Sequence, residues 1–209
     1  MSDAIRVGLI GYGYASKTFH APLIGGTPGM ALTRVSSSEA GKVHADWPGV
    51  RVVSAAKDLL NDPDIDLVVI ATPNDTHFPL AKAALEAGKH VVVDKPFTVT
   101  LSQARELESL AKHCGRVLSV FHNRRWDSDF LTVRALINEG QLGEVCYFES
   151  HFDRFRPQVR QRWREQGGPG SGIWYDLGPH LLDQAVVLFG LPVSITVDLA
   201  QLRPGAQST

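Results

Sequence analysis

The chain has 209 residues, of which 44% are hydrophobic and 21% charged, with a formal net charge of -1. This balance argues against the basic surface that nucleic-acid or membrane-surface binding requires. No apolar run approaches the length of a membrane-spanning helix, and the N-terminus enters a strand at once, which leaves no room for a signal peptide. Cys114 and Cys146 fit no zinc or redox spacing. We therefore expect a cytoplasmic protein without a metal site and without nucleic-acid or membrane partners.

Apolar strands alternate with helices through the first part of the chain. The predicted strands are 5–11, 31–36, 50–53, 66–72, 90–94 and 117–121, and the predicted helices include 54–61, 76–87 and 100–113. Thr100 and Gln103 match a capping box at the start of the third of these helices. Six alternations of this kind predict an α/β fold, a doubly wound parallel Rossmann sheet, and we assign residues 1–123 to a dinucleotide-binding domain.

A glycine-rich turn follows the first strand. Gly11 and Gly13 stand in a GxGxx pattern, followed by Tyr14, Ala15 and then Ser16, where the usual fingerprint has glycine or alanine. Such a turn brings the backbone close to a pyrophosphate and aims a helix N-terminus at it. Taken alone the pattern also fits an ordinary glycine turn, but its place at the first strand favours a nicotinamide dinucleotide.

The end of the second strand bears on the choice between NADP and NAD. An acidic residue there would bind the ribose 2′-hydroxyl group, but this chain has Ser36, Ser37 and Ser38. Small hydroxyl side chains leave room for a 2′-phosphate, and Lys42 is a candidate cation for it. Glu39 argues the other way, and Lys42 also fits a solvated helix lysine. We expect NADP, with NAD as the alternative.

Two further strand ends carry candidate site residues. The loop after the fourth strand holds Thr72, Pro73, Asn74 and His77, which could contact the cofactor ribose or nicotinamide, although His77 also fits a helix-start histidine without a ligand. The fifth strand ends in Asp94-Lys95-Pro96. Pro96 restricts Lys95 to extended geometry, so an amine is delivered to the edge of the sheet where α/β proteins bind ligands.

The pattern changes after residue 124. We expect helices at 128–139 and 173–190, strands at 144–152 and 193–201, and an arginine-rich loop between them with Arg154, Arg156, Arg160, Arg162 and Arg164. Two strands are too few for an independent sheet. We therefore interpret 124–209 as the start of an α+β substrate and oligomerisation domain with an open antiparallel sheet, truncated here because the chain is a fragment of a longer polypeptide.

Oxidation of an alcohol needs a hydride acceptor and a group that takes the hydroxyl proton. Lys95 could serve as that group if burial and a cationic nicotinamide lower its pKa. Asp176 and His180 are four residues apart, so on a helix they share one face, and a carboxylate can orient an imidazole for a proton relay. The same pair also fits a helix-capping pair, and Gly178-Pro179 between them suggests a helix start or kink.

These motifs resemble, over essentially the whole chain, the glucose-fructose oxidoreductase, inositol dehydrogenase and rhizopine-catabolism (Gfo/Idh/MocA) family. The matching segments are 8–13, 72–77, 94–96, 123–125, 163–164 and 176–180. The usual Glu-Lys-Pro triplet of the family is Asp-Lys-Pro here, which leaves the contact of the acid open. The segments 121–127 and 162–165 further resemble NADP-dependent scyllo-inositol dehydrogenases, including an enterobacterial oxidoreductase of that kind.

The resemblance implies that Lys95 and His180 act in proton transfer with the help of Asp176. It also implies cofactor contacts from residues outside the glycine turn, namely Asn123, Arg124, Trp163 and Arg164. The expected function is hydride transfer between NADP and a sugar or cyclic polyol such as an inositol, in a homo-oligomer (dimer or tetramer). The alternatives are a dehydrogenase of another carbonyl substrate and a non-catalytic nucleotide-binding regulator on the same fold.

Overall fold

The computed structural model describes residues 4–153 and 155–208. The chain forms two compact units, Met1–Phe121 and His122–Thr209, and each is described here by itself. Arg154, one of the arginines predicted to lie in a polar loop, is outside the described residues.

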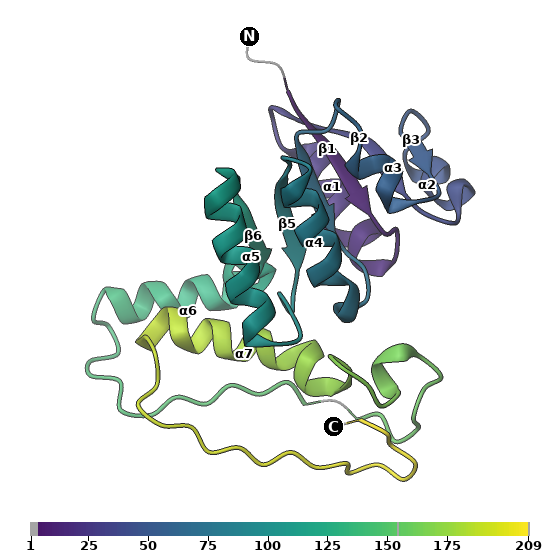
Figure 1. The fold of residues 1–209 in the computed structure, drawn as a ribbon. Coiled ribbons are helices and arrows are strands. Elements are labelled where there is room, and N and C mark those ends of the chain that lie inside the picture. The colour runs from purple at the N-terminus through teal and green to yellow at the C-terminus, as the bar shows by residue number, and fades with distance from the viewer. Residues whose placement is uncertain (1–3, 154, 209) are drawn as a thin grey trace. The chain divides into compact units, whose positions relative to one another are not determined.

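The first unit is built on a six-stranded, fully parallel sheet (Figure 1). Its strands are β1 (Ile5–Ile10), β2 (Met30–Ser36), β3 (Arg51–Val53), β4 (Leu67–Ile70), β5 (His90–Asp94) and β6 (Leu118–Phe121). The spatial order β3-β2-β1-β4-β5-β6 is that of a doubly wound dinucleotide-binding sheet. The predicted fold class is therefore confirmed for this unit, and each predicted strand is present.

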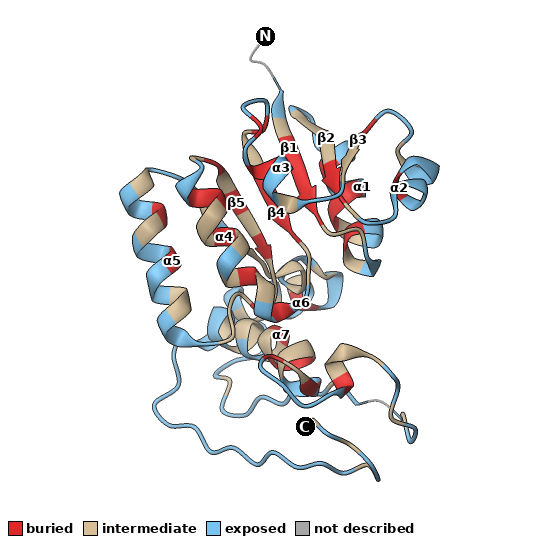
Figure 2. Ribbon diagram, turned by 45° about the vertical axis from the view of Figure 1, so that its right-hand side comes forward, coloured by how far each residue is buried: buried red, intermediate tan, exposed pale blue. Residues whose placement is uncertain are grey.

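Helices cover both faces of this sheet. They are α1 (Ala21–Gly26), α2 (Ala40–Asp46), α3 (Ala56–Leu60), α4 (His77–Glu86) and α5 (Leu101–Cys114). One buried cluster joins α1 and α2 to the sheet, and another joins α3, α4 and α5 to it. The central strands are accordingly the most buried elements (Figure 2). A strand covered on both faces reads as a continuous apolar run, which explains the three valines of β5.

Local sequence signals set both ends of α5. Thr100 accepts the backbone N–H of Gln103 while the Gln103 side chain accepts the backbone N–H of Thr100, so the predicted capping box is confirmed at α5. Gly115 ends the same helix in the left-handed conformation, with φ of 62°. These two caps fix where α5 begins and ends.

The second unit is helical in its regular elements. It contains α6 (Ser128–Asn138), α7 (Gly172–Phe189) and the short 3₁₀ turns η3 (Asn123–Trp126) and η4 (Trp163–Glu165). The helix predicted over 173–190 is confirmed, and it continues through Pro179.

The strands predicted at 144–152 and 193–201 are wrong, because neither segment forms a strand among the residues that the structure describes. Their alternating apolar residues are largely exposed, as at Val193, Ile195 and Val197. A strand exists only through hydrogen bonds to a neighbour, and two segments cannot make a stable sheet alone. No antiparallel sheet is therefore present in the described part of this unit.

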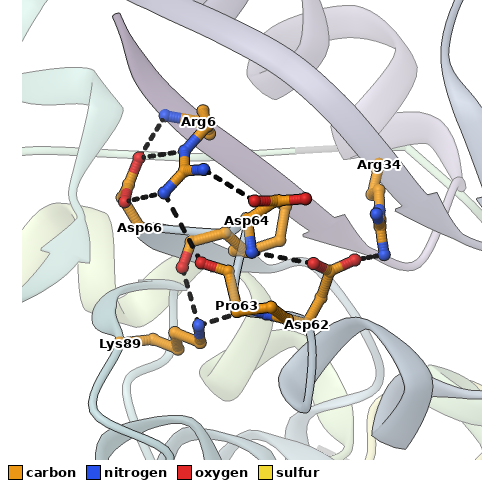
Figure 3. A network of polar contacts seen from close by, with 8 residues as sticks. Arg6, Arg34, Asp62, Pro63, Asp64, Asp66 and Lys89 are labelled. Atoms are coloured by element: carbon orange, nitrogen blue, oxygen red, sulfur yellow. Dashed lines mark hydrogen bonds and ion pairs between the residues drawn. The ribbon is translucent and has the colours of Figure 1, made fainter. Parts of the chain in front are cut away.

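A polar network closes the amino edge of the sheet, opposite the strand ends that carry the candidate site (Figure 3). Arg6 donates to both carboxylate oxygens of Asp66 at 3.0 and 2.9 Å and to Asp64 at 3.0 Å. These hydrogen bonds lower the pKa of Asp66 to about 2. The buried Lys89 ammonium donates to the backbone oxygens of Asp62 and Ile65 at 2.7 and 2.8 Å. The loop before β4 is thus tied to β1 and to the start of β5.

A search of the described residues found no helix with the length and apolar character needed to cross a membrane.

Candidate active site

The glycine turn after β1 is held by contacts that only glycine permits at its first position. Gly11 has φ of 88°, and a Cβ atom there would lie 2.6 Å from the backbone oxygen of Ala71. Its N–H donates to the Ser36 oxygen at 2.9 Å, which joins the ends of β1 and β2. Ser16, which replaces the usual glycine or alanine, is fully buried and its hydroxyl donates to the Gly11 oxygen at 2.8 Å. The serine therefore closes the turn from inside.

Gly13 differs from Gly11 because nothing in the fold requires it. A Cβ atom at Gly13 would meet no atom within 4 Å, and its φ is not positive. The space above the backbone at Gly13 is open, as the close approach of a pyrophosphate requires. Ala15 precedes the π-helical turn Ser16–His20, and the exposed Tyr14 ring stands edge-on to Phe19 with centroids 6.1 Å apart. The residues present thus fit a dinucleotide.

Tyr12, between the two glycines, ties the turn to α2. Its hydroxyl donates to Asp46 Oδ2 at 2.9 Å, and the Lys17 ammonium also lies 2.9 Å from that oxygen. Partial burial, followed by the hydrogen bond to Asp46, raises the pKa of Tyr12 to about 12. The phenol therefore stays protonated and keeps donating at neutral pH.

The end of β2 presents the serine cluster predicted from the sequence. Ser36 is buried, Ser37 is half-buried and Ser38 is exposed. Ser37 is fixed by its N–H, which donates to the Val53 oxygen at 3.0 Å. Lys42 lies in the first turn of α2, and its exposed ammonium forms an ion pair with Glu39 at 2.6 Å. Lys42, the candidate cation for a 2′-phosphate, is therefore already paired with the acidic Glu39 at the surface.

The loop after β4 is tightly folded. The hydroxyls of Thr72 and Thr76 lie 2.6 Å apart, and Thr76 also donates to the Pro73 oxygen at 2.6 Å. Asn74 is buried in the short 3₁₀ turn η2 (Asn74–Thr76). His77 begins α4 and is only 1% exposed; its Nδ1 lies 2.8 Å from the Pro96 oxygen and its Nε2 lies 3.0 Å from the Thr72 oxygen. Its ring nitrogens are thus occupied by backbone groups of two loops.

The Asp94-Lys95-Pro96 turn stands at the carboxyl end of β5, with a cis peptide bond before Pro96. Asp94 uses both oxygens: Oδ1 accepts the Lys95 backbone N–H at 2.7 Å, and Oδ2 lies 3.3 Å from Nε2 of His20. Burial alone would raise the pKa of Asp94, but the hydrogen bond and charge of His20, together with Lys95, outweigh it and lower that pKa. Asp94 is therefore ionised and anchors the backbone of Lys95.

In the second unit, an aromatic ring joins two candidate residues. The guanidinium of Arg124 lies over the Phe152 ring at 5.1 Å, and the His180 ring stands edge-on to Phe152 with centroids 6.4 Å apart. Arg124 is further held by Asp127 at 2.8 Å, and its backbone oxygen accepts from Gln184 of α7 at 3.0 Å. Asn123 opens the same turn, η3. His180 is 5% exposed, so its ring is positioned by packing.

Arg164 brings the other candidates of this unit together. Its guanidinium stacks over Trp163 at 4.9 Å, and its Nε lies 3.8 Å from Asp176 Oδ1. Asp176 and His180 are both on α7, four residues apart, so they share one face of the helix. The neighbouring Glu165 is buried and pairs with Arg162 at 2.8 Å and with Arg203. The charges of Arg162 and Arg203 are thus balanced by Glu165 within the chain.

The structure also holds residues that the sequence did not single out. His20 is 3% exposed, contacts Asp94 and packs its ring at 4.3 Å from Phe121. Phe152 contacts two candidates. The one signal for His20 in the sequence was its place shortly after the glycine turn, and Phe152 had no signal beyond its size.

The fold and the open glycine turn define a dinucleotide-binding protein of the Rossmann class. Residues 5–122 match the family model described as "Oxidoreductase family, NAD-binding Rossmann fold", and residues 130–209 match the "GFO/IDH/MocA C-terminal domain". The chain belongs to the Gfo/Idh/MocA oxidoreductase family, as its motifs predicted. A nicotinamide cofactor is the corresponding cofactor class.

Three known proteins illustrate the similarity. The oxidoreductase YdgJ of Escherichia coli is 83% identical over all of this chain and 60% of its own length. The scyllo-inositol 2-dehydrogenase (NADP(+)) IolW of Bacillus subtilis is 40% identical over 99% of this chain and 58% of its own length. The solved structure of the YPO2259 oxidoreductase of Yersinia pestis has 72% identity and a TM-score of 0.93, covering 100% of this chain and 59% of that one. The chain thus spans about 60% of the length of these relatives.

Proposed function

We propose that the protein is an NADP-dependent dehydrogenase that transfers hydride between the nicotinamide and a CH–OH group of a sugar or cyclic polyol such as an inositol. The observation that carries this proposal is the anchored lysine: Asp94 fixes the Lys95 backbone at 2.7 Å, on the same sheet edge as the open turn at Gly13. The name of IolW, an NADP-linked scyllo-inositol dehydrogenase at 40% identity, supports the substrate class.

Residues of the first unit would hold the cofactor. The backbone of Gly11, Gly13 and Ala15 suits the pyrophosphate, and the hydroxyls of the serine cluster suit a 2′-phosphate. Lys42 would exchange its exposed Glu39 partner for that phosphate, since an exposed ion pair of this kind contributes little to stability. When bound, the cofactor supplies the hydride acceptor or donor.

The chain itself must manage the proton of the substrate hydroxyl. We assign Lys95 and His180 to proton transfer at that oxygen, with Asp176 supporting the charged form of the relay. Lys95 belongs to the first unit, and His180 and Asp176 belong to the second. Residues 124–209 would then supply substrate and subunit contacts, together with the additional length that the relatives have.

The test is made on the complete protein with a panel of inositols and aldoses, following the absorbance of the reduced nicotinamide. We expect turnover with NADP on at least one polyol. Lys95→Ala and Lys95→Arg are both expected to lose turnover, because arginine keeps the positive charge but cannot release a proton, while Lys95→Arg still binds cofactor. Full activity in Lys95→Ala, or tight NADP binding without hydride exchange on any substrate, contradicts the proposal, and the second result favours a nucleotide-binding regulator.

A further inference from the structure

His77 makes two contacts that cannot both be hydrogen bonds in a neutral ring. Its Nδ1 and Nε2 lie 2.8 and 3.0 Å from the backbone oxygens of Pro96 and Thr72. A carbonyl oxygen only accepts, and neutral imidazole has one donor nitrogen and one acceptor nitrogen. In a neutral ring one nitrogen lone pair would therefore point at a carbonyl oxygen. Only the imidazolium form satisfies both contacts.

We propose that His77 is a doubly protonated, buried imidazolium that ties the Thr72 and Pro96 carbonyls together and thereby acts as a positioning residue for Lys95. The two loops that it joins follow β4 and β5, which are neighbours in the sheet. One loop carries the candidate cofactor contacts Thr72 to Asn74 and the other carries Lys95. A single side chain thus sets the spacing between the two. This inference rests on the proposed role of Lys95.

The surroundings of His77 determine whether a buried charge is tolerable there. Burial and the N-terminal end of α4 both disfavour a cation. Two charge-assisted hydrogen bonds to carbonyl oxygens oppose this cost, and such bonds are about twice as strong as neutral ones. His77 is the first residue of α4, where the dipole acts most strongly, so the two direct hydrogen bonds must outweigh both costs.

Among the described residues, no carboxylate pairs with the His77 ring in place of the two carbonyl oxygens. β4, Leu67–Ile70, has no titratable side chain. Asp94 at the end of β5 is engaged by His20 and by the Lys95 backbone, and Asp75 of η2 is exposed. The ionisable side chains on the adjoining helices are occupied or exposed as well: Glu106 of α5 pairs with Lys82 at 2.7 Å, and Lys57 and Asp58 of α3 are exposed. The charge of the ring is therefore matched by the two backbone oxygens.

The first test is independent of activity. The complete protein is prepared with ¹⁵N-labelled histidine rings, and the His77 signals are assigned by their loss in His77→Gln. We expect both ring nitrogens of His77 to carry a proton at neutral pH. A single ring proton on His77 overturns the proposal. This measurement needs no substrate and no folded His77→Phe protein.

The second test separates positioning from folding. Active sites are first counted by NADPH binding, and kcat and KM are then measured per site for His77→Phe, which keeps the ring shape without donors, and His77→Gln, which keeps one donor group. We expect kcat to fall about 10- to 100-fold in His77→Phe, because a small displacement of reacting groups lowers the rate by such factors. The loss should be smaller in His77→Gln, and the KM for the polyol should change little. His113→Phe serves as the control.

Wild-type kcat per site in both His77 variants overturns the inference even if Lys95→Ala is inactive. Retained activity in Lys95→Ala contradicts the proposed function instead, so the two failures are distinguishable.

Discussion

The buried His20 pairs with the part-buried Asp94 across the first unit, with His20 Nε2 3.3 Å from Asp94 Oδ2. His20 lies in the π-helical turn after β1, and Asp94 ends β5. Because Oδ1 of the same carboxylate accepts the Lys95 N–H at 2.7 Å, the pair connects the helix after the glycine turn to the backbone of the lysine. Asp94, which stands where the family usually has glutamate, therefore contacts both His20 and the Lys95 backbone.

The charge of Asp94 is expected to matter more than its hydrogen-bonding shape. Asp94→Asn keeps an oxygen for the Lys95 N–H but removes the charge that His20 faces, which should cost about 1–3 kcal/mol of stability for a largely buried group. We expect kcat to fall as well, whereas Asp94→Glu keeps the charge and should retain more activity. Urea unfolding and steady-state kinetics of both variants check this. Equal kcat values in Asp94→Asn and wild type would sink the idea.

The two glycines of the turn should respond differently to alanine. Gly11→Ala forces a positive φ and a contact of 2.6 Å with the Ala71 oxygen, so we expect a loss of about 1–3 kcal/mol. Gly13→Ala meets no protein atom and should leave the melting temperature unchanged while weakening NADP(H) binding about tenfold or more. Thermal unfolding and cofactor titration give the two readouts. A Gly13→Ala protein with wild-type cofactor affinity contradicts the proposed pyrophosphate contact.

Cofactor preference should depend on the ion pair between Lys42 and Glu39. Lys42→Ala removes the candidate cation for the 2′-phosphate, so we expect the Kd for NADP to rise about tenfold and the Kd for NAD to stay the same. Glu39→Gln frees Lys42 from its 2.6 Å partner and should strengthen NADP binding. Titration of both variants with both cofactors is the measurement. Equal changes in the Kd values for NAD and NADP would show that Lys42 does not bind the 2′-phosphate.

Acid should weaken the amino edge of the sheet through Asp66. The hydrogen bonds from Arg6 lower the pKa of Asp66 to about 2 in the folded state, compared with roughly 3.9 for an unperturbed aspartate. A group with a lowered folded pKa contributes stability above its unfolded pKa, and this contribution is lost as the pH falls from about 4 toward 2. The pair is partly exposed, so we expect a contribution of only about 1 kcal/mol.

The measurement for Asp66 is urea unfolding of wild type and Asp66→Asn between pH 2 and pH 7. We expect the difference in unfolding free energy to be constant at neutral pH and to shrink below about pH 4. Asp75→Asn, at an exposed aspartate of η2, serves as the control. A difference that is independent of pH contradicts this account.

Local pattern was sufficient for the strands of the first unit and for the helix over 173–190, but it was wrong for the two strands predicted in the second unit. The valines of β5 and the capping box at Thr100 are signals carried by neighbouring residues, and the structure confirms both. The segments around Tyr147 and Val197 also alternate like strands, but pairing depends on a partner that a local pattern does not contain. The contact between His20 and Asp94 spans 74 residues, and the backbone partners of His77 depend on how two loops fold. Neither could be deduced from residue type and spacing.

The π-helical turn Ser16–His20 fixes the length of the chain between the glycine turn and α1. At its start, Ser16 closes the turn onto Gly11, and just after its end Ala21 and Ile24 pack into the core. Removing one residue would rotate one half against the other by roughly a quarter of a turn, so either the Ser16 contact to Gly11 or the core packing of Ala21 and Ile24 would be lost. The stretch is therefore locked in length, and insertions or deletions should be far less tolerated there than in the exposed loop at Gly29.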